Sequence, residues 1–286
     1  MLLSGATGFI GRALGPALEA AGHEVRAGTR RPEGYSGAGS PVGLDVLDGA
    51  SVAAAMADCD AAFYLVHSME SHNFAARDRE AATIFARAAA ADGVRVVYLG
   101  GLGDAGSAGS TSEHLGSRHE VGQILRDGCD GVELRAAIVV GAGSTGFEIL
   151  RQLVDRLPVM VCPRWVTTRC QPIGLDDVVR YLCAGPCLPA GVYEIGGADV
   201  LTYEQMMRRY ATLTGHRRLI LKVPVLSPSL SSHWIGLVTD QPPSVARPLA
   251  EGLSVEVVVT DDRIRGLVPF EPLGFDEAMR RALGPA

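Results

Sequence analysis

Short apolar segments alternate with longer amphipathic ones over roughly the first 140 residues of the chain. Apolar runs of strand length are typical of a parallel sheet covered on both faces, and the segments between them are typical of helices that return the chain. We therefore predict an α/β fold with a doubly wound parallel sheet and a ligand crevice at the carboxyl ends of its strands. The predicted strands are Leu2–Ser4, Glu24–Thr29, Pro41–Leu44 (the weakest), Ala61–Val66, Val94–Gly100 and Val132–Val140, and the predicted helices are Gly11–Ala21, Gly49–Ala57, Phe74–Ala91 and Glu113–Asp127.

The regular alternation loosens after Gly141. Val192–Gly197 reads as a further strand, which we expect to return to the main sheet. The stretch Leu219–Thr239 carries repeated prolines and serines. We interpret residues 1–200 as one large domain and residues 201–286 as a small cap that is partly interleaved with it. Between these landmarks we predict helices at Phe147–Arg156, Leu175–Ala184 and Thr202–Thr214, a strand at Pro158–Cys162 and a connecting segment at Thr168–Ile173.

Composition and charge argue against several classes of function. Of the 286 residues, 47% are hydrophobic, and the formal net charge is −6 with no block of lysine or arginine. We therefore expect neither nucleic-acid binding nor attachment to a membrane surface. No apolar run reaches the roughly 18 residues of a membrane span, and the first motif leaves no room for a signal peptide, so we expect a cytoplasmic protein. The six cysteines are scattered without a Cys-x-x-Cys pair, so we expect neither a metal site nor a disulfide.

A glycine-rich turn lies between the first predicted strand and the first predicted helix. Glycine tolerates positive φ and has no Cβ, so the backbone N–H groups of such a turn can approach a pyrophosphate closely. The helix that follows presents its positive N-terminus to the same phosphates. Three spaced glycines alone are weak evidence, but a strand before them and a helix after them are the context that a dinucleotide site requires. We assign the pyrophosphate to Gly5, Thr7, Gly8, Phe9, Ile10 and Gly11.

The end of the second predicted strand indicates which dinucleotide is bound. Sites selective for NAD carry an acidic residue there, which accepts hydrogen bonds from the ribose hydroxyls. This chain has Thr29, Arg30 and Arg31 instead. The planar fork of an arginine matches a phosphate, so we predict NADP(H), with both arginines on the 2′-phosphate and Thr29 adding a hydroxyl contact. The alternative is an exposed loop with two solvated arginines.

Two further strand ends are predicted to contact the cofactor. Asp45 follows the third strand, where its carboxylate would reach the adenine amino group, whereas Asp48 is an N-cap candidate for the next helix. Val66, His67 and Ser68 end the fourth strand at the crevice, so we expect them beside a ribose of the cofactor. A purely structural histidine is the alternative interpretation of His67.

Several motifs in the first 200 residues carry a family resemblance. They are Gly5–Gly11 (GATGFIG), Asp45–Asp48 (DVLD), Tyr64–Ser68 (YLVHS), Leu134–Gly141 (LRAAIVVG), Gln171–Val178 (QPIGLDDV) and Tyr193–Gly197 (YEIGG). On these motifs the chain resembles the short-chain dehydrogenase/reductase superfamily, and within it the atypical, NmrA-like NAD(P)H-binding branch. The resemblance implies a Rossmann-type fold, a nicotinamide cofactor and a small-molecule substrate held by the C-terminal segment. Beyond Thr202 it is looser.

The chain departs from the family at its catalytic positions. Conventional members place a serine after the fifth strand and a Tyr-x3-Lys motif on the next helix. Here Gly100 and Gly101 stand where the serine would be, and His114 and Arg118 have the spacing of the tyrosine and lysine. Residues four apart share a helix face, so His114 can donate a proton while Arg118 lowers its pKa and binds the cofactor. The alternative is an ordinary solvated helix start.

We predict an NADPH-dependent oxidoreductase, acting as a reductase on a small and fairly apolar organic molecule. His233 and Trp234 are the candidate substrate residues, or else Trp234 anchors its segment in the core. Two rival functions remain: a non-catalytic NADPH-binding sensor or assembly protein, which the missing serine, tyrosine and lysine favour, and a lyase, isomerase or cyclase on the same fold. A homodimer is possible on the resemblance alone.

Overall fold

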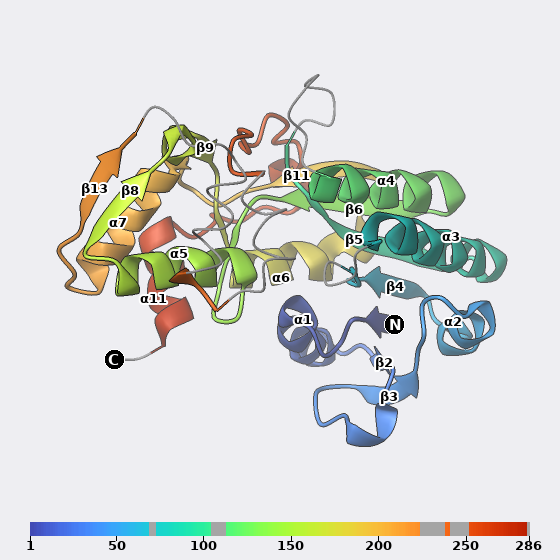
Figure 1. Ribbon diagram of the computed structural model, residues 1–286. Coiled ribbons are helices and arrows are strands. Elements are labelled where there is room, and N and C mark those ends of the chain that lie inside the picture. Colours follow the sequence, from blue (N-terminus) through green and yellow to red (C-terminus); the bar gives the residue numbers. More distant parts are fainter. Residues whose placement is uncertain (69–72, 104–112, 224–237, 241–251, 285–286) are drawn as a thin grey trace.

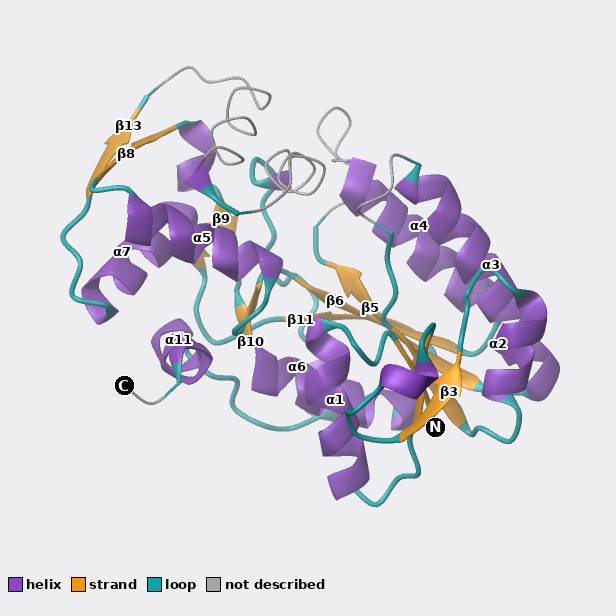
Figure 2. Cartoon of the chain, turned by 60° about the horizontal axis from the view of Figure 1, so that its bottom comes forward, coloured by secondary structure: helices purple, strands orange, loops and turns teal. Residues whose placement is uncertain are grey.

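The computed structural model describes residues 1–68, 73–103, 113–223, 238–240 and 252–284. It has a larger lobe built on a seven-stranded sheet and a smaller lobe built around two helices, α5 and α7 (Figures 1 and 2).

The sheet of the larger lobe is parallel throughout. Its strand order is β11-β6-β5-β4-β1-β2-β3, so the order reverses direction next to β1, where the chain begins. The carboxyl ends of all seven strands therefore lie along one edge, and the crevice beside β1 is the place where such sheets bind ligands. The strands are β1 (Leu2–Ser4), β2 (Arg26–Thr29), β3 (Ser40–Gly43), β4 (Ala61–Tyr64), β5 (Arg95–Gly101), β6 (Gly131–Ala136) and β11 (Gly191–Ile195).

Helices cover both faces of this sheet because successive strand residues point to opposite sides. Leu3, Phe63 and Val97 pack in one hydrophobic cluster with α1 and α6, whereas their neighbours Leu2 and Tyr64 pack in another cluster with α2, α3 and α4. Apolar strands with both faces buried are what the sequence pattern predicts. The helices are α1 (Phe9–Ala20), α2 (Gly49–Met56), α3 (Phe74–Asp92), α4 (Glu113–Gly128) and α6 (Leu175–Ala184).

The smaller lobe has its own hydrophobic cluster. The apolar sides of α5 and α7 meet there, together with β8 and α11, and Phe147, Met206 and Tyr210 are among its buried side chains. The described elements of this lobe are β7 (Val139–Val140), α5 (Thr145–Arg156), β8 (Val159–Cys162), the 3-10 helix η2 (Arg164–Thr167), β9 (Arg169–Cys170), β10 (Ile173–Gly174), β12 (Leu201–Thr202), α7 (Tyr203–Leu213), β13 (Leu219–Lys222) and α11 (Phe275–Leu283). Three shorter 3-10 or α-helical turns are η1 (Pro32–Gly34), η3 (Gly185–Cys187) and α10 (Ile264–Leu267).

Most predicted elements are confirmed, with two corrections. Helix α1 begins at Phe9, two residues before the predicted start. The strand predicted at Val132–Val140 is wrong as one element, because β5 ends at Gly101, which pairs with Ala136. Beyond Ala136 the chain has no neighbour in the main sheet, and it instead forms β7, which pairs with β10.

The predicted domain boundary at residue 200 stays a prediction. The hydrophobic cluster around α7 includes side chains from both sides of that boundary.

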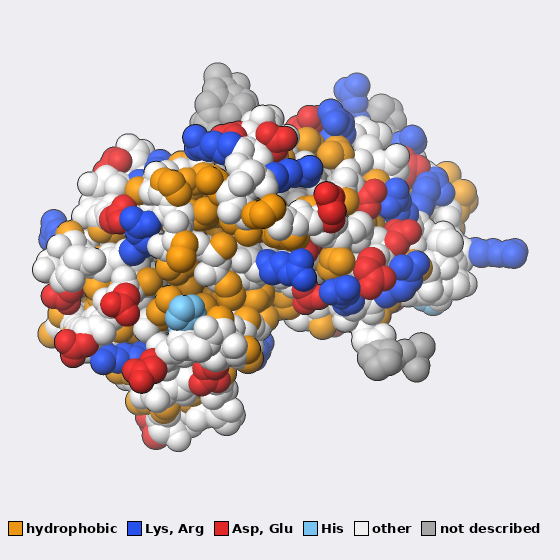
Figure 3. Space-filling model, turned by 180° about the vertical axis from the view of Figure 1, so that it is seen from behind, with side chains coloured by type: hydrophobic (Ala, Val, Ile, Leu, Met, Phe, Trp, Pro, Cys, Tyr) orange, Lys and Arg blue, Asp and Glu red, His pale blue; other side chains and the backbone are white. Residues whose placement is uncertain are grey.

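The surface carries charges of both signs. On the face seen in Figure 3, acidic and basic side chains are interspersed over the surface. Within the described part of the chain, no helix is both long enough and apolar enough to cross a bilayer.

Candidate functional site

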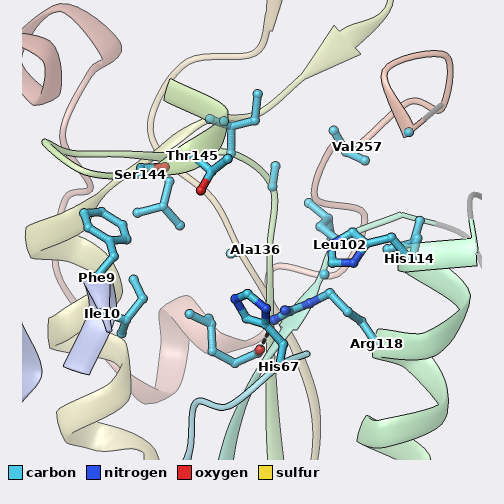
Figure 4. A pocket seen from close by; sticks show the side chains of 18 of the residues that line it. Phe9, Ile10, His67, Leu102, His114, Arg118, Ala136, Ser144, Thr145 and Val257 are labelled. Atoms are coloured by element: carbon cyan, nitrogen blue, oxygen red, sulfur yellow. Dashed lines mark hydrogen bonds between the residues drawn. The ribbon is translucent and has the colours of Figure 1, made fainter. Parts of the chain in front are cut away.

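A cavity of about 410 Å³ lies at the carboxyl edge of the sheet, between the two lobes. Its floor comes from the glycine turn and from the ends of β4, β5 and β6, and its far wall comes from α5, η2 and α7 (Figure 4). The walls are mostly apolar. Polar and charged side chains at the wall include His67, His114, Arg118, Ser144 and Thr145.

The glycine turn forms one end of the cavity, and its conformation depends on the absence of side chains. Gly5 has φ +73°, and a Cβ there would lie 2.8 Å from the carbonyl oxygen of Leu65. The N–H of Gly8 donates to the carbonyl of Gly5 at 2.9 Å, which closes the turn. A Cβ on Gly11 would lie only 2.2 Å from the same carbonyl, so α1 can approach the turn closely only with glycine at this position.

The N-terminus of α1 is open at this end of the cavity. Its N-cap residue is Gly8, which has no side chain to bond the first turn, and the first turn contains no acidic residue. The first N–H groups of the helix therefore keep their capacity to bind an anion. The residues present fit the diphosphate of a dinucleotide.

His67, His114 and Arg118 all point into the same cavity (Figure 4). Burial, and then the charge of Arg118, lowers the pKa of His67 to about 4. Burial likewise lowers the pKa of His114 to about 3, with smaller contributions from Arg118 and His67. The His67 side chain is exposed to the open cavity, whereas that of His114 is half-buried. Protein surrounds the cavity, and both rings are neutral at neutral pH.

Arg118 is held from two sides. Its guanidinium donates to the carbonyl of Leu99 and lies over the ring of Tyr98, with 5.6 Å between its central carbon and the ring centroid. The Tyr98 hydroxyl donates to the carbonyl of Arg118 at 3.1 Å. Among the described residues, these contacts use one N–H group of the guanidinium, so its other N–H groups remain available to a ligand.

Asp78 of α3 lies behind the polar cluster formed by His67, His114 and Arg118, and it is 7% exposed. Burial raises its pKa, and its hydrogen bonds to Ser68 and the nearby charge of Arg118 oppose that shift. Ser68 thus bonds to α3 rather than lining the cavity. The effect is to fix the segment after β4, which carries His67.

Two glycines, Gly100 and Gly101, occupy the place of the conventional serine, where β5 packs against β6 and α4. A Cβ on Gly101 would come within 2.8 Å of Leu115, and one on Gly100 would come within 2.8 Å of the buried carboxylate of Glu133. A serine at either position would therefore push against a packed side chain.

Residues 5–129 match the model of a family described as NAD(P)H-binding. The chain carries an NAD(P)H-binding domain. The prediction of a nicotinamide dinucleotide as cofactor is thereby confirmed. A search of the curated proteins found no match.

Solved structures resemble the whole chain, not only the NAD(P)H-binding domain. A nucleoside-diphosphate-sugar epimerase from Staphylococcus aureus has a TM-score of 0.77 at 16% identity, with 98% of this chain and 99% of that chain covered. An NADPH-dependent quinone oxidoreductase from Escherichia coli, solved with NADPH, also reaches 0.77 at 16% identity, covering 97% and 98%. An NAD-dependent NDP-hexosamine 5,6-dehydratase reaches 0.68 at 18% identity, covering 99% and 95%.

Identities this low establish the fold alone, and the predicted Rossmann-type fold is confirmed. Two consequences of the predicted family resemblance are thus confirmed, the NAD(P)H-binding domain and the fold. The NmrA-like branch stays a prediction.

The structure brings most of the predicted site residues to one cavity. Its wall includes Gly5, Gly8, Phe9, Ile10, Gly11, Val66, His67, His114 and Arg118. Thr7, Arg30, Arg31 and Asp45 are exposed outside it, and Thr29 accepts a hydrogen bond from the N–H of Arg31 at 3.3 Å. One carboxylate oxygen of Asp45 accepts from the N–H of Leu47, and Asp48 caps α2 as predicted. His233 and Trp234 lie outside the described residues, so their role stays a prediction.

Sequence reasoning missed the apolar wall opposite the NAD(P)H-binding domain. The motif Leu134–Gly141 was a usable signal, because it ends at the same sheet edge as the glycine turn. The side chains of the smaller lobe gave no comparable signal, since apolar residues at helical spacing are typical of any core. The missed residues include Ile138, Ile149, Leu150, Leu153, Trp165, Tyr203, Met207, Leu253 and Val257.

Proposed function

We propose that the protein is an NADP(H)-dependent reductase of a small, uncharged and largely apolar carbonyl compound. One observation carries this proposal: a single cavity runs from the glycine turn, past His67, His114 and Arg118, to an apolar wall supplied by the smaller lobe. A dinucleotide on the turn and a small molecule against the wall would meet at the three polar side chains.

The cofactor would be held along the carboxyl edge of the sheet. The glycine turn and the first N–H groups of α1 would bind the diphosphate, and Val66, His67 and Ser68 lie on the segment next to it. Arg30 and Arg31 would bind the 2′-phosphate. Among the described residues neither guanidinium makes an ion pair or a hydrogen bond, so both are available for that role.

Asp45 would accept a hydrogen bond from the adenine amino group, since one of its carboxylate oxygens is not used by the turn that follows β3. Thr29 would add its hydroxyl beside the arginines. These four contacts lie outside the cavity and are proposed from their position at the ends of β2 and β3.

A bound reduced nicotinamide supplies a hydride. The protein's own part is to bind the substrate carbonyl, to exclude water with the apolar wall, and to stabilise the charge that develops on the oxygen. Arg118 is the charged group placed for that task, and the neutral ring of His114 would donate a hydrogen bond to the same oxygen.

The wall indicates the kind of substrate. A nucleotide sugar carries a diphosphate, which would require several cationic groups. Among the described lining residues, Arg118 is the one lysine or arginine, and it lies on α4 rather than on the wall supplied by the smaller lobe. The charge of the wall therefore favours a neutral substrate over the sugar nucleotide of the epimerase, and it is compatible with a substrate such as that of the quinone oxidoreductase.

Titration calorimetry with NADPH and NADH tests the cofactor assignment. We expect NADPH to bind the wild-type protein more tightly than NADH. Arg30→Asp should weaken NADPH binding by about 1.5–3 kcal/mol, the contribution of a charge-assisted hydrogen bond, and should leave NADH binding unchanged or stronger, because an acidic residue there can accept hydrogen bonds from the ribose hydroxyls. Arg87→Asp is the matched control, because Arg87 is an exposed arginine on α3, away from the site.

Two outcomes would contradict the proposal. Equal affinity of wild-type protein and Arg30→Asp for NADPH would refute the role of the arginines. Tight NADPH binding without oxidation by any carbonyl compound in a broad panel would favour the sensor function, which the absence of a serine at Gly101 supports.

A further inference from the structure

Groups that can release a proton are scarce around Arg118. His67 and His114 are neutral rings, because burial and the neighbouring guanidinium oppose their protonation. The Tyr98 hydroxyl is 3.1 Å from the carbonyl oxygen of Arg118, to which it donates. Tyr203 donates to the thiol of Cys170, at the other end of the cavity.

The remaining hydroxyls lie on the opposite wall. Ser144 and Thr145 begin α5 and face the cluster across the cavity in Figure 4. Alcohols are also far weaker acids than an imidazolium. A proton delivered in step with bond formation therefore has no obvious source among the described lining residues.

A positive charge, by contrast, is present and fixed. Guanidinium groups keep their protons at any physiological pH, and the contacts with Leu99 and Tyr98 hold that of Arg118 at the cavity wall. Such a group stabilises an anion without transferring a proton to it. The local chemistry thus suits a product that leaves as an anion.

We infer that the substrate is a conjugated carbonyl compound, a quinone or an α,β-unsaturated ketone, whose reduced form is held as a delocalised anion by Arg118. This inference rests on the proposed reductase function and names its substrate class. A saturated ketone would give a localised alkoxide, which is so basic that it needs a proton as the C–H bond forms. An enolate or a hydroquinone anion does not.

The electrons and atoms of the step balance as follows. With an enone, a C–H bond of the reduced nicotinamide breaks, and its electron pair forms a new C–H bond at the β-carbon of the substrate. The carbon–carbon π pair shifts toward the carbonyl, and the negative charge comes to rest on oxygen beside Arg118. The substrate gains two electrons, the nicotinamide loses two, and water protonates the anion after release.

Binding of p-nitrophenol without cofactor tests the anion site directly, because its phenolate is delocalised and absorbs visible light. We expect the midpoint of ionisation of the bound molecule to lie at least one pH unit below its value in water. Arg118→Met should abolish the shift, Arg118→Lys should keep part of it, and Arg87→Met on the exposed side of α3 should keep all of it. The lysine variant preserves the test if the methionine variant does not fold.

A substrate panel with NADPH completes the test. We expect turnover of a naphthoquinone and of a cyclic enone at least 100-fold faster than that of the corresponding saturated ketone. Equal turnover of the saturated ketone, no turnover of either conjugated compound, or a nitrophenol midpoint that Arg118→Met leaves unchanged would each overturn the inference. Absence of NADPH binding in calorimetry would instead overturn the proposed function itself.

Discussion

The substitution Gly11→Ala tests the closest backbone approach in the NAD(P)H-binding domain. A Cβ at this position would lie 2.2 Å from the carbonyl oxygen of Gly5 and 2.8 Å from the Cα of Ala6. Both neighbours are backbone atoms, so no side-chain rotation relieves the overlap. Ordinary contact of a Cβ begins at 3.4 Å, so α1 and the glycine turn would have to separate by about 1.2 Å.

The expected magnitudes follow from that displacement. Overpacking of this kind costs about 1–3 kcal/mol, and the better helix propensity of alanine offsets about 0.5–1 kcal/mol of it. We expect the free energy of unfolding to fall by about 0–2.5 kcal/mol. Losing one charge-assisted N–H bond to the diphosphate costs about 1.5–3 kcal/mol, which corresponds to NADPH affinity weaker by about 10- to 150-fold.

Urea denaturation and NADPH calorimetry measure the two effects. Gly116→Ala is the matched control, because Gly116 lies inside α4 and a Cβ there would meet no atom within 4 Å. That variant should bind NADPH normally and gain up to about 1 kcal/mol of stability. If Gly11→Ala matched the wild-type protein in both assays, the idea that this close contact shapes the cofactor turn would be refuted.

Two further predictions concern charge. Because the pKa values of His67 and His114 are lowered to about 4 and about 3, the unfolded chain binds more protons than the folded one below pH 6.5, so their contribution to stability falls as the pH drops toward 4. The pKa of Asp78 is raised, so Asp78 affects the pH dependence of stability in the opposite sense, and a comparison with a variant is needed to isolate the histidines. We expect urea denaturation at pH 4.5 and 7 to show that the stability of a His67→Asn, His114→Gln double variant depends less on pH than that of the wild-type protein. An equal change in stability between the two pH values would contradict the lowered pKa values. Glu133→Gln should destabilise the fold by about 3 kcal/mol in urea denaturation, because the Glu133 side chain is 1% exposed and forms ion pairs with two arginines. Glu120→Gln should change stability little, because Glu120 forms its ion pair at the exposed surface. Equal effects of these two substitutions would show that burial does not decide the strength of the pair.

The elements near the glycine turn were predictable because their signals are local. Three glycines at fixed spacing, an apolar strand before them and an amphipathic helix after them lie within 20 residues. The central strands were equally readable, since β1 and β4 are short, mostly apolar and buried on both faces, whereas the edge strand β3 is largely exposed and was the weakest signal. The end of β6 could not be predicted from the sequence, because the length of the neighbouring strand β5 decides where the pairing of β6 stops.

The sequence by itself determined that this chain has a glycine turn before a helix, a parallel sheet, and glycines, a histidine and an arginine at the positions of the conventional serine, tyrosine and lysine. Only the tertiary structure decided which side chains lie together at the cavity. His67 follows β4 and Arg118 lies on α4, and they meet because β4 and β5 are neighbours in the sheet and α4 packs over β5. The neutrality of the two histidines and the apolar wall have the same origin: desolvation depends on which distant segments fold over a group, and residue type does not record that.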